Sequence, residues 1–205
     1  MDFNEKAKQW DQDPDRAARA KAFAAEIRKI SGNKIFENAL EFGCGTGNVS
    51  IMLADRCKKM ILADTSEGML DVVREKIVNM GISNMEPFLI TPANPLAKIN
   101  NADIVFTLLT MHHVKDLDQV FGEFSGIMGK NSLLFIGDLI TEDGSFHFRD
   151  PEFDGHKGFD TENLKGLLKK HGLETISDKI FYTIDREHNS VMKEYPLFCL
   201  AARKL

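Results

Sequence analysis

The chain has 205 residues, of which 43% are hydrophobic and 28% charged, and its formal net charge is −5 at pH 7. This length and balance are typical of one globular domain with a sizeable core. The negative charge argues against a dedicated surface for nucleic acids or anionic membranes, because neither would be attracted to it. The polar N-terminus is not a signal peptide, and no apolar run reaches the roughly 18 residues of a membrane span. We therefore expect a cytoplasmic protein with reduced cysteines and no membrane or nucleic-acid partner.

The first predicted element is a helix over 14–30, and strands and helices alternate after it. Pro14 suits the first turn of this helix, and Ala20 and Ile27 belong to a set of small or apolar residues near helical spacing. The apolar runs that follow are predicted as strands at 38–42, 59–64, 85–90, 102–109 and 132–139. Helices are predicted between them at 48–57, 65–81 and 117–129. Strands that alternate with helices predict an α/β protein with a mostly parallel sheet covered on both faces.

The last part of the chain changes character. The segment 160–172 is predicted as a helix, and 173–184 and 194–205 are predicted as strands. The polar connection between these strands, 185–193, is short enough for a hairpin. We therefore expect the last strand to run antiparallel to its neighbour.

One long segment, 140–159, fits no regular element. It has no clear period and is rich in Asp, Gly, His and Phe. A structureless connection of this length is usually functional or disordered, and its four phenylalanines argue against disorder because something should bury them. We interpret this segment as a lid over a site.

Three alternating glycines, Gly43, Gly45 and Gly47, separate the first predicted strand from the helix after it. A glycine-rich turn here lets the backbone approach a ligand, and the helix N-terminus faces that ligand. Asp64 ends the second predicted strand, about 20 residues later, where a carboxylate can accept hydrogen bonds from both ribose hydroxyls. The two signals together predict an adenosine-containing ligand across the strand ends.

Two families of adenosine-binding proteins compete for this pattern. The dinucleotide fingerprint G-x-G-x-x-G has its third glycine where this chain has Asn48, which counts against an NAD-dependent oxidoreductase. The stretches EFGCGTG, ADTSEGML, ADIVFTLLTMHHV and GKNSLLFIGDL, with the opening FNEKAKQWD, instead resemble the class I S-adenosylmethionine-dependent methyltransferases. The resemblance covers most of the chain and implies S-adenosylmethionine as cofactor. It also implies a Rossmann-like three-layer sandwich whose seven-stranded sheet has the order 3-2-1-4-5-7-6, with the last strand antiparallel.

The same resemblance implies one methyltransferase domain over 1–205, with an N-terminal helical flap at 1–32 and the lid-like insertion at 140–159. It implies that Glu41 supports the glycine loop and the amino end of the cofactor. Many relatives hold the adenine amino group with an Asp after strand three, where this chain has Pro92, so backbone groups of Ala93 are expected to serve the ring instead. The predicted cofactor-binding residues are Glu41, Gly43, Cys44, Gly45, Thr46, Gly47, Asp64, Thr65, Met69, Pro92, Ala93, Leu108 and Trp10.

Some of these residues also have a structural interpretation. Met69 is at a position that more often belongs to a core than to an adenine contact. Trp10, the only tryptophan, either staples the N-terminal segment to the body or closes over the methyl group as part of the flap. Both alternatives stay open for Trp10.

The candidate catalytic residues are histidines. His113 belongs to the pair His112-His113 after the fourth strand, for which we favour a structural role over a general base. His147 and His156 are interleaved with phenylalanines in 140–159, which suits an aromatic substrate pocket with a base. The carboxylates and histidines of this segment match no metal-binding spacing, so no metal is expected.

The sequence thus predicts methyl transfer from S-adenosylmethionine to a small molecule, with an oxygen, nitrogen or carbon acceptor atom undetermined. Little chain is left over for a domain that would bind a macromolecule. An NAD-dependent oxidoreductase, a non-catalytic adenosyl-ligand-binding protein and a protein methyltransferase remain as alternatives. A homo-oligomer is possible.

Overall fold

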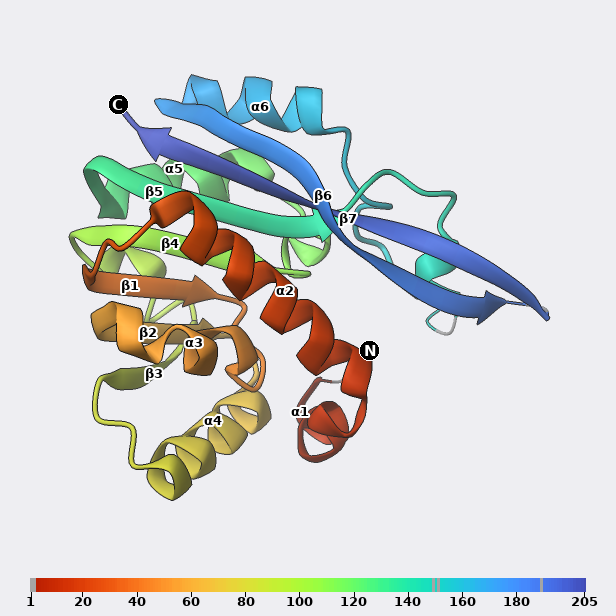
Figure 1. The fold of residues 1–205 in the computed structure, drawn as a ribbon, viewed down its shortest axis with the longest axis horizontal. Coiled ribbons are helices and arrows are strands. Elements are labelled where there is room, and N and C mark those ends of the chain that lie inside the picture. The colour runs from red at the N-terminus through yellow and green to blue at the C-terminus, as the bar shows by residue number, and fades with distance from the viewer. Residues whose placement is uncertain (1–2, 149, 151, 189) are drawn as a thin grey trace.

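A seven-stranded sheet between two layers of helices forms the centre of the computed structural model, which describes residues 3–148, 150, 152–188 and 190–205 (Figure 1). The strand order is β3-β2-β1-β4-β5-β7-β6. The neighbouring pairs from β3 to β5 are parallel, and β7 runs antiparallel to both β5 and β6. The expected Rossmann-like sandwich, its strand order and its antiparallel last strand are therefore confirmed.

The elements alternate along the chain as the sequence pattern predicts. The strands are β1 (Phe36–Phe42), β2 (Cys57–Asp64), β3 (Met85–Leu89), β4 (Ala102–Leu108), β5 (Met128–Leu139), β6 (Leu173–His188) and β7 (Val191–Lys204). The helices are α1 (Phe3–Lys6), α2 (Pro14–Ser31), α3 (Asn48–Met52), α4 (Glu67–Met80), α5 (Leu117–Ile127) and α6 (Thr161–Lys170). Short 3₁₀ turns are η1 (Ala7–Gln12), η2 (Ala54–Arg56), η3 (Leu96–Lys98), η4 (Met111–His113) and η5 (Ser145–His147).

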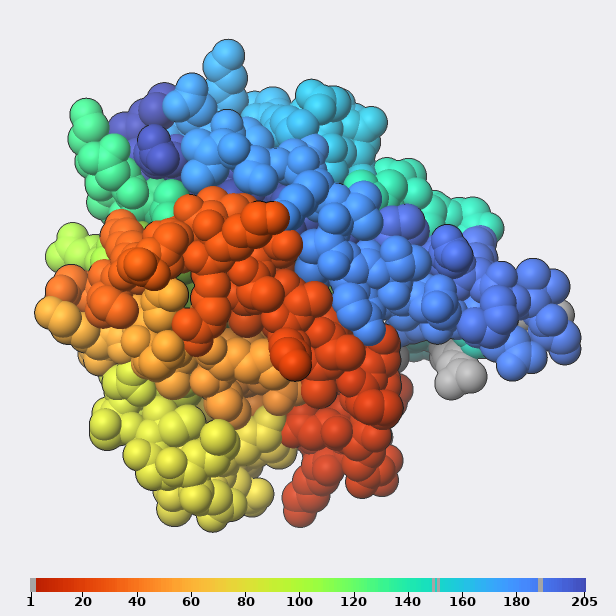
Figure 2. Space-filling model, in the orientation of Figure 1, coloured from red at the N-terminus to blue at the C-terminus, as the bar shows by residue number. Residues whose placement is uncertain are grey.

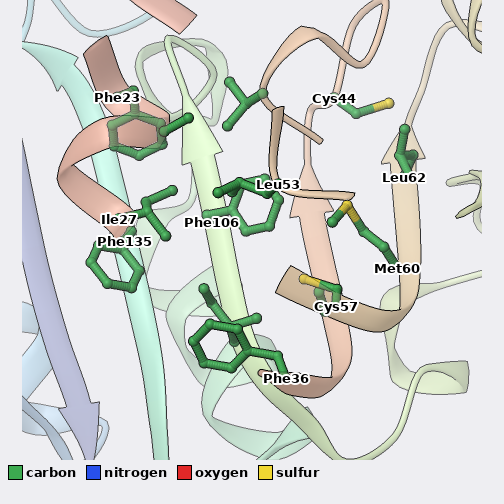
Figure 3. Packing of buried hydrophobic residues seen from close by; sticks show 14 of the residues in the cluster. Phe23, Ile27, Phe36, Cys44, Leu53, Cys57, Met60, Leu62, Phe106 and Phe135 are labelled. Carbon is green, nitrogen blue, oxygen red and sulfur yellow. The ribbon is translucent and has the colours of Figure 1, made fainter. Parts of the chain in front are cut away.

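Each face of the sheet has its own apolar cluster. Helices α2, α3 and α4 pack on one face, and α5 and α6 pack on the other. Figure 3 shows the first cluster, in which Phe23 and Ile27 of α2 lie against Phe106 of β4. Val105, the neighbour of Phe106, belongs to the second cluster, and both side chains are fully buried. This alternation explains why β4 is apolar at consecutive positions. Across the described residues, no helix is both long and apolar enough to cross a bilayer.

The helix predicted over 48–57 is shorter than expected. Helix α3 ends at Met52, the turn η2 follows, and Cys57 already pairs with Phe36 in the parallel ladder. The Asn84 side chain donates hydrogen bonds to the carbonyl oxygens of Ala54 (2.8 Å) and Cys57 (2.7 Å). A side chain from a distant loop therefore stabilises this bend, so the apolar pattern of residues 48–57 could not predict where the helix ends.

The C-terminal hairpin is longer than expected. The connection predicted at 185–193 is largely strand, because β6 and β7 stay paired from Leu173 opposite Lys204 to His188 opposite Val191. Figure 1 shows the hairpin reaching past the rest of the sheet. Its polar outer half still has an apolar anchor, since Ile184 and Tyr195 are buried against Phe146. Ile184 and Tyr195 face each other across the two strands, so the tertiary packing of this one pair extends the ladder into a polar stretch.

The predicted lid, 140–159, leaves β5 and returns to α6 as a loop that is closed at its base. Phe159 N donates to Leu139 O at 2.8 Å, and Glu142 N donates to Lys157 O at 2.9 Å. Of the four phenylalanines expected to be buried, Phe146 and Phe159 are, whereas Phe153 is half-buried and Phe148 is exposed. Because His156 N donates to His112 O at 2.7 Å, the loop also lies against η4.

Candidate active site

A cavity of about 270 Å³ opens at the carboxyl ends of the central strands. It is lined by Glu41 from β1, Asp64 from β2 and Leu108 from β4, among others. The chain order of the sheet reverses between β1 and β4, so the connections after these two strands diverge to opposite faces. That divergence leaves a crevice at this point, which is where open α/β sheets bind ligands.

The glycine loop forms one wall of the cavity. Gly43, Gly45 and Gly47 have φ of 66°, 51° and 77°, in the left-handed region that favours glycine. A Cβ on Gly43 would overlap the side chain of Thr110 and come within 2.7 Å of its Cβ. A Cβ on Gly45 would meet only Trp10 Nε1, at 3.7 Å. Gly43 is therefore required by packing, whereas Gly45 leaves its backbone open to the cavity.

Asp64 ties this loop to the sheet. Its Oδ2 accepts a hydrogen bond from Gly45 N at 2.8 Å, and its Oδ1 accepts one from Ser66 N at 2.9 Å. Burial raises the pKa of Asp64, and these hydrogen bonds act in the opposite direction by favouring the ionised carboxylate. Asp64 and its neighbour Thr65 both line the cavity at the end of β2.

Glu41 is a second carboxyl group in the cavity wall, and its side chain is 2% exposed. Burial raises its pKa to about 8, against an ordinary value of 4.5. Both the backbone N of Ser50 (3.2 Å) and the Ser50 hydroxyl donate hydrogen bonds to Oε2. Glu41 is therefore largely protonated near pH 7, and a cationic ligand beside it would favour the ionised form.

The N-terminal segment lies over the glycine loop and the start of α4. Asp11 Oδ1 accepts hydrogen bonds from Thr46 Oγ1 (2.7 Å) and Asn48 Nδ2 (2.9 Å), and its Oδ2 pairs with Lys76 Nζ at 2.7 Å. Asn4 Oδ1 accepts a hydrogen bond from Gly68 N, at the start of α4, at 2.9 Å. Figure 2 shows this segment, in red, between α4 in yellow and the β6–β7 hairpin in blue. These contacts place residues 3–12 as a cover on the cavity.

Trp10 lines the cavity as part of this cover. The Arg16 guanidinium lies 3.5 Å from the centroid of the indole, and the Phe3 ring centroid lies 5.8 Å away. The two interpretations of Trp10 are thus compatible, since the same ring packs the segment and faces the cavity. A role beside a methyl group stays a prediction.

Two arginines of α2 line the cavity and were not among the predicted residues. Arg16 donates to Trp10 O at 3.0 Å, and Arg19 pairs with Asp15 at 2.7 Å. Burial lowers the pKa of both guanidinium groups. The run DPDRAARA contains a pattern that points to them: Arg16 and Arg19 are three residues apart and therefore share one face of the predicted helix.

The other predicted cofactor residues divide into two groups. Several line the cavity, and these are Cys44, Thr46, Met69 and Leu108. Gly47 lies beneath the loop, where a Cβ would come within 3.0 Å of Leu62 Cδ2. Pro92 and Ala93 lie outside the lining, in a turn closed by Thr91 and Asn94, and Ile90 reaches the cavity instead. An adenine contact through the backbone of Ala93 stays a prediction.

The predicted catalytic histidines are not all brought to the cavity. His113 lines it, and His147 lies beside His113 with ring centroids 5.5 Å apart. Burial and neighbouring imidazoles lower the pKa of each to about 4, so both are neutral near pH 7. The third, His156, hydrogen-bonds Val114 O at 2.9 Å and is not part of the lining. Their catalytic roles stay predictions.

His112 has the structural surroundings that we expected for one member of the pair. It is buried, and its Nδ1 lies 2.7 Å from Asp138 Oδ1. Asp138 is also fully buried and accepts hydrogen bonds from the backbone N of His112 (3.2 Å) and of Leu139 (2.8 Å). Asp138 was not among the predicted site residues.

Comparison with known proteins agrees with this geometry. A family model described as "Methyltransferase domain" matches residues 40–136. An uncharacterized methyltransferase of Schizosaccharomyces pombe is 29% identical over 150 residues, which cover 65% of this chain and 52% of that protein. Two further curated relatives from Bacillus are spanned over 60% and 62% of their length. The chain thus spans about half to three fifths of the curated relatives that it matches.

Solved structures share the whole fold at low sequence identity. An S-adenosylmethionine-dependent methyltransferase of Aquifex aeolicus is 19% identical with a TM-score of 0.71, and the match covers 100% of both chains. One from Clostridium acetobutylicum is 16% identical with a TM-score of 0.72 over 98% of each chain. The solved structures show the shared fold, and with the family-model match over residues 40–136 and the glycine loop beside Asp64 these findings support a class I S-adenosylmethionine-dependent methyltransferase.

Proposed function

We propose that the protein transfers the methyl group of S-adenosylmethionine to a small molecule that binds in the same cavity. The observation that carries this proposal is the pairing of a glycine-loop backbone with two carboxyl groups, the buried Glu41 and the half-buried Asp64, at the switch point of the sheet. A cationic sulfonium and ammonium suit such acidic surroundings, whereas a dinucleotide pyrophosphate does not.

In this proposal each part of the wall has one task. Asp64 accepts hydrogen bonds from the ribose hydroxyls, and the open backbone at Gly45 passes the methionine part of the cofactor. Glu41 lies near its amino end. S-adenosylmethionine supplies an electrophilic methyl group, and charge is neutralised during the transfer. The protein therefore contributes mainly orientation and the exclusion of water, for which the cover formed by residues 3–12 is suited.

The rest of the lining suggests what the acceptor is like. Arg16 and Arg19 offer guanidinium groups, and Phe3 and Trp10 offer aromatic surface. A small acceptor with an apolar body and an anionic or hydrogen-bond-accepting group matches these side chains. His113 is the candidate base, since it lines the cavity and is neutral near pH 7. A cavity of about 270 Å³ beneath a cover favours a small molecule over a protein as acceptor.

Isothermal titration calorimetry tests the cofactor assignment. Wild-type protein is titrated with S-adenosylmethionine, S-adenosylhomocysteine and NAD, and the titrations are repeated on Asp64→Ala and on the control Asp71→Ala. Asp71 has the same charge but lies on α4, paired with Arg74 at the surface. We expect micromolar binding of both adenosyl ligands, a loss of at least tenfold in Asp64→Ala and no change in Asp71→Ala.

Two outcomes contradict the proposal. Binding of NAD in place of the adenosyl ligands favours the oxidoreductase alternative. Binding of S-adenosylmethionine without S-adenosylhomocysteine formation in a screen of small anionic acceptors favours the non-catalytic alternative. The cytoplasmic location and the oligomeric state stay predictions.

A further inference from the structure

Three imidazole rings meet beside the cavity although they come from two separate parts of the chain. His112 and His113 belong to η4, which follows β4, and His147 belongs to η5 inside the loop 140–159. One nitrogen of each ring lies within 4.8 Å of the corresponding nitrogens of the other two. The centroids of the His112 and His147 rings are 5.1 Å apart. Small side-chain rotations therefore bring three nitrogens around one point.

Asp138 fixes the orientation of the most buried ring. Its carboxylate accepts a hydrogen bond from His112 Nδ1 at 2.7 Å, so the hydrogen of this imidazole is on Nδ1. The lone pair of His112 is then on Nε2, the other side of the ring. A buried carboxylate that holds a histidine in this way is the usual partner of a metal-ligating histidine, because it sets the tautomer and raises the basicity of the ligand nitrogen.

The second observation concerns His147. Its Nε2 is buried and, among the residues that the structure describes, has no hydrogen-bond partner. Leaving such an atom without a partner is unfavourable. The ring is held in place because it stacks on Phe153, with centroids 3.7 Å apart and an interplanar angle of 10°. A fixed, buried and unpaired nitrogen beside two other imidazoles indicates a missing ligand.

Two features of the cluster bear on metal binding, the carboxylate that orients His112 and the unpaired nitrogen of His147. The hydrogen bond between Asp138 and His112 also fits a structural role, but the buried, unpaired Nε2 of His147 beside it does not. Both features are explained by one ion.

We propose that His112, His113 and His147 bind a divalent first-row transition metal ion, for which Zn²⁺ is the best match. Three imidazole ligands with one open position are the arrangement of catalytic zinc sites, and imidazole also suits copper, iron and nickel. His113 lines the cavity, so the open position lies on the cavity side. This reverses the expectation of no metal, because the three histidines are up to 35 residues apart in the chain and only the fold brings them together.

The metal site goes beyond the proposed methyl transfer. A His113 that ligates the ion cannot also act as the base, because its one lone pair is on the metal. If the acceptor binds in this cavity, the ion would instead hold an acceptor oxygen or nitrogen and lower the pKa of a hydroxyl bound to it. Only this consequence rests on the proposed function. The binding of the ion itself depends on the four side chains His112, His113, His147 and Asp138.

Metal titration tests the site without any need for enzyme activity. Full-length protein is freed of metal with a chelator and titrated with Zn²⁺ by calorimetry, and with Co²⁺ by visible absorption. His147→Ala is compared with His156→Ala, which removes a histidine from the same loop but from outside the cluster. We expect one Zn²⁺ per chain with micromolar or tighter affinity and the intense visible absorption of four-coordinate Co²⁺. His147→Ala should weaken binding at least tenfold, and His156→Ala should leave it unchanged.

The outcomes separate this proposal from the cofactor assignment. Absence of Zn²⁺ and Co²⁺ binding by wild type, or equal binding by wild type and His147→Ala, overturns the metal site whatever the protein does with S-adenosylmethionine. Asp138→Asn gives a second readout, since loss of the orienting carboxylate should weaken Zn²⁺ binding about 10- to 100-fold. If Asp138→Asn fails to fold, as circular dichroism would show, the His147→Ala comparison alone decides.

Discussion

The two walls of the cavity are built in different ways. The glycine-loop wall comes from one continuous stretch, β1 to the start of α4, and its functional atoms are backbone groups and the carboxyl groups at the ends of two strands. The histidine wall is the cluster beside the cavity, in which His113 lines the cavity and His112, Asp138 and His147 lie behind it; its side chains come from η4, from the end of β5 and from the loop 140–159. Backbone geometry dominates the first wall and side-chain packing the second. Substitutions should therefore affect ligand binding and stability through different mechanisms at each wall.

The largest effect is expected for Gly43→Ala on the glycine-loop wall. A methyl group here overlaps Thr110 and also requires a left-handed φ of 66°. We expect a loss of about 3 kcal/mol or more in the free energy of unfolding, measured by urea denaturation. Gly45→Ala has the same backbone strain without the overlap and should cost about 1 kcal/mol.

A double variant tests whether the overlap is the reason. Thr110→Gly removes the overlapping side chain, so Gly43→Ala should cost less in that background than in wild type. Equal costs for Gly43→Ala and Gly45→Ala would show that backbone strain alone governs this wall.

The second effect concerns the pH dependence of stability through Glu41. Its pKa is about 8 in the folded protein and 4.5 ordinarily, so between these values the folded protein holds a proton that the unfolded chain has released. The free energy of unfolding therefore falls as pH rises through this window, by at most about 3 kcal/mol at pH 7. Glu41→Gln keeps the shape of the protonated group and removes this penalty.

We accordingly expect Glu41→Gln to be more stable than wild type at pH 7 and equally stable near pH 4, measured by thermal unfolding across pH. The same variant should bind S-adenosylmethionine more weakly, because the carboxylate that a cation would favour is gone. A variant that gains stability at every pH, or that binds the cofactor as wild type does, would refute this account of Glu41.

The smallest effect is expected on the histidine wall. Tyr195 of β7 places its hydroxyl 2.7 Å from Ser145 Oγ, at the start of the turn that carries His147. Tyr195→Phe removes one hydrogen bond and should cost about 1 kcal/mol. Amide hydrogen exchange should become faster in 140–159 and stay unchanged in the glycine loop. Faster exchange in the glycine loop as well would mean that the two walls are not independent.

What could be predicted from the sequence follows the same division. The alternation of strands and helices, the cavity position and the glycine loop with Asp64 were within reach, because they depend on local periodicity, on turn chemistry and on a motif of fixed spacing. The strand order came from the family resemblance. The bend at Cys57 and the long hairpin were missed. The bend at Cys57 depends on a hydrogen bond from Asn84 in a distant loop, and the long hairpin depends on the burial of Ile184 and Tyr195.

The sequence by itself determined which fold forms and where its adenosyl ligand should bind. The alternation of predicted strands and helices, and the spacing between Gly43 and Asp64, can both be seen in the order of residues along the chain. The tertiary structure alone decided that Arg16 and Arg19 line the cavity and that His147 joins His112 and His113. The physical reason is that the arginines reach the cavity only after α2 has packed on the sheet, and the histidines meet only after the loop 140–159 has packed against η4. No local periodicity encodes that packing.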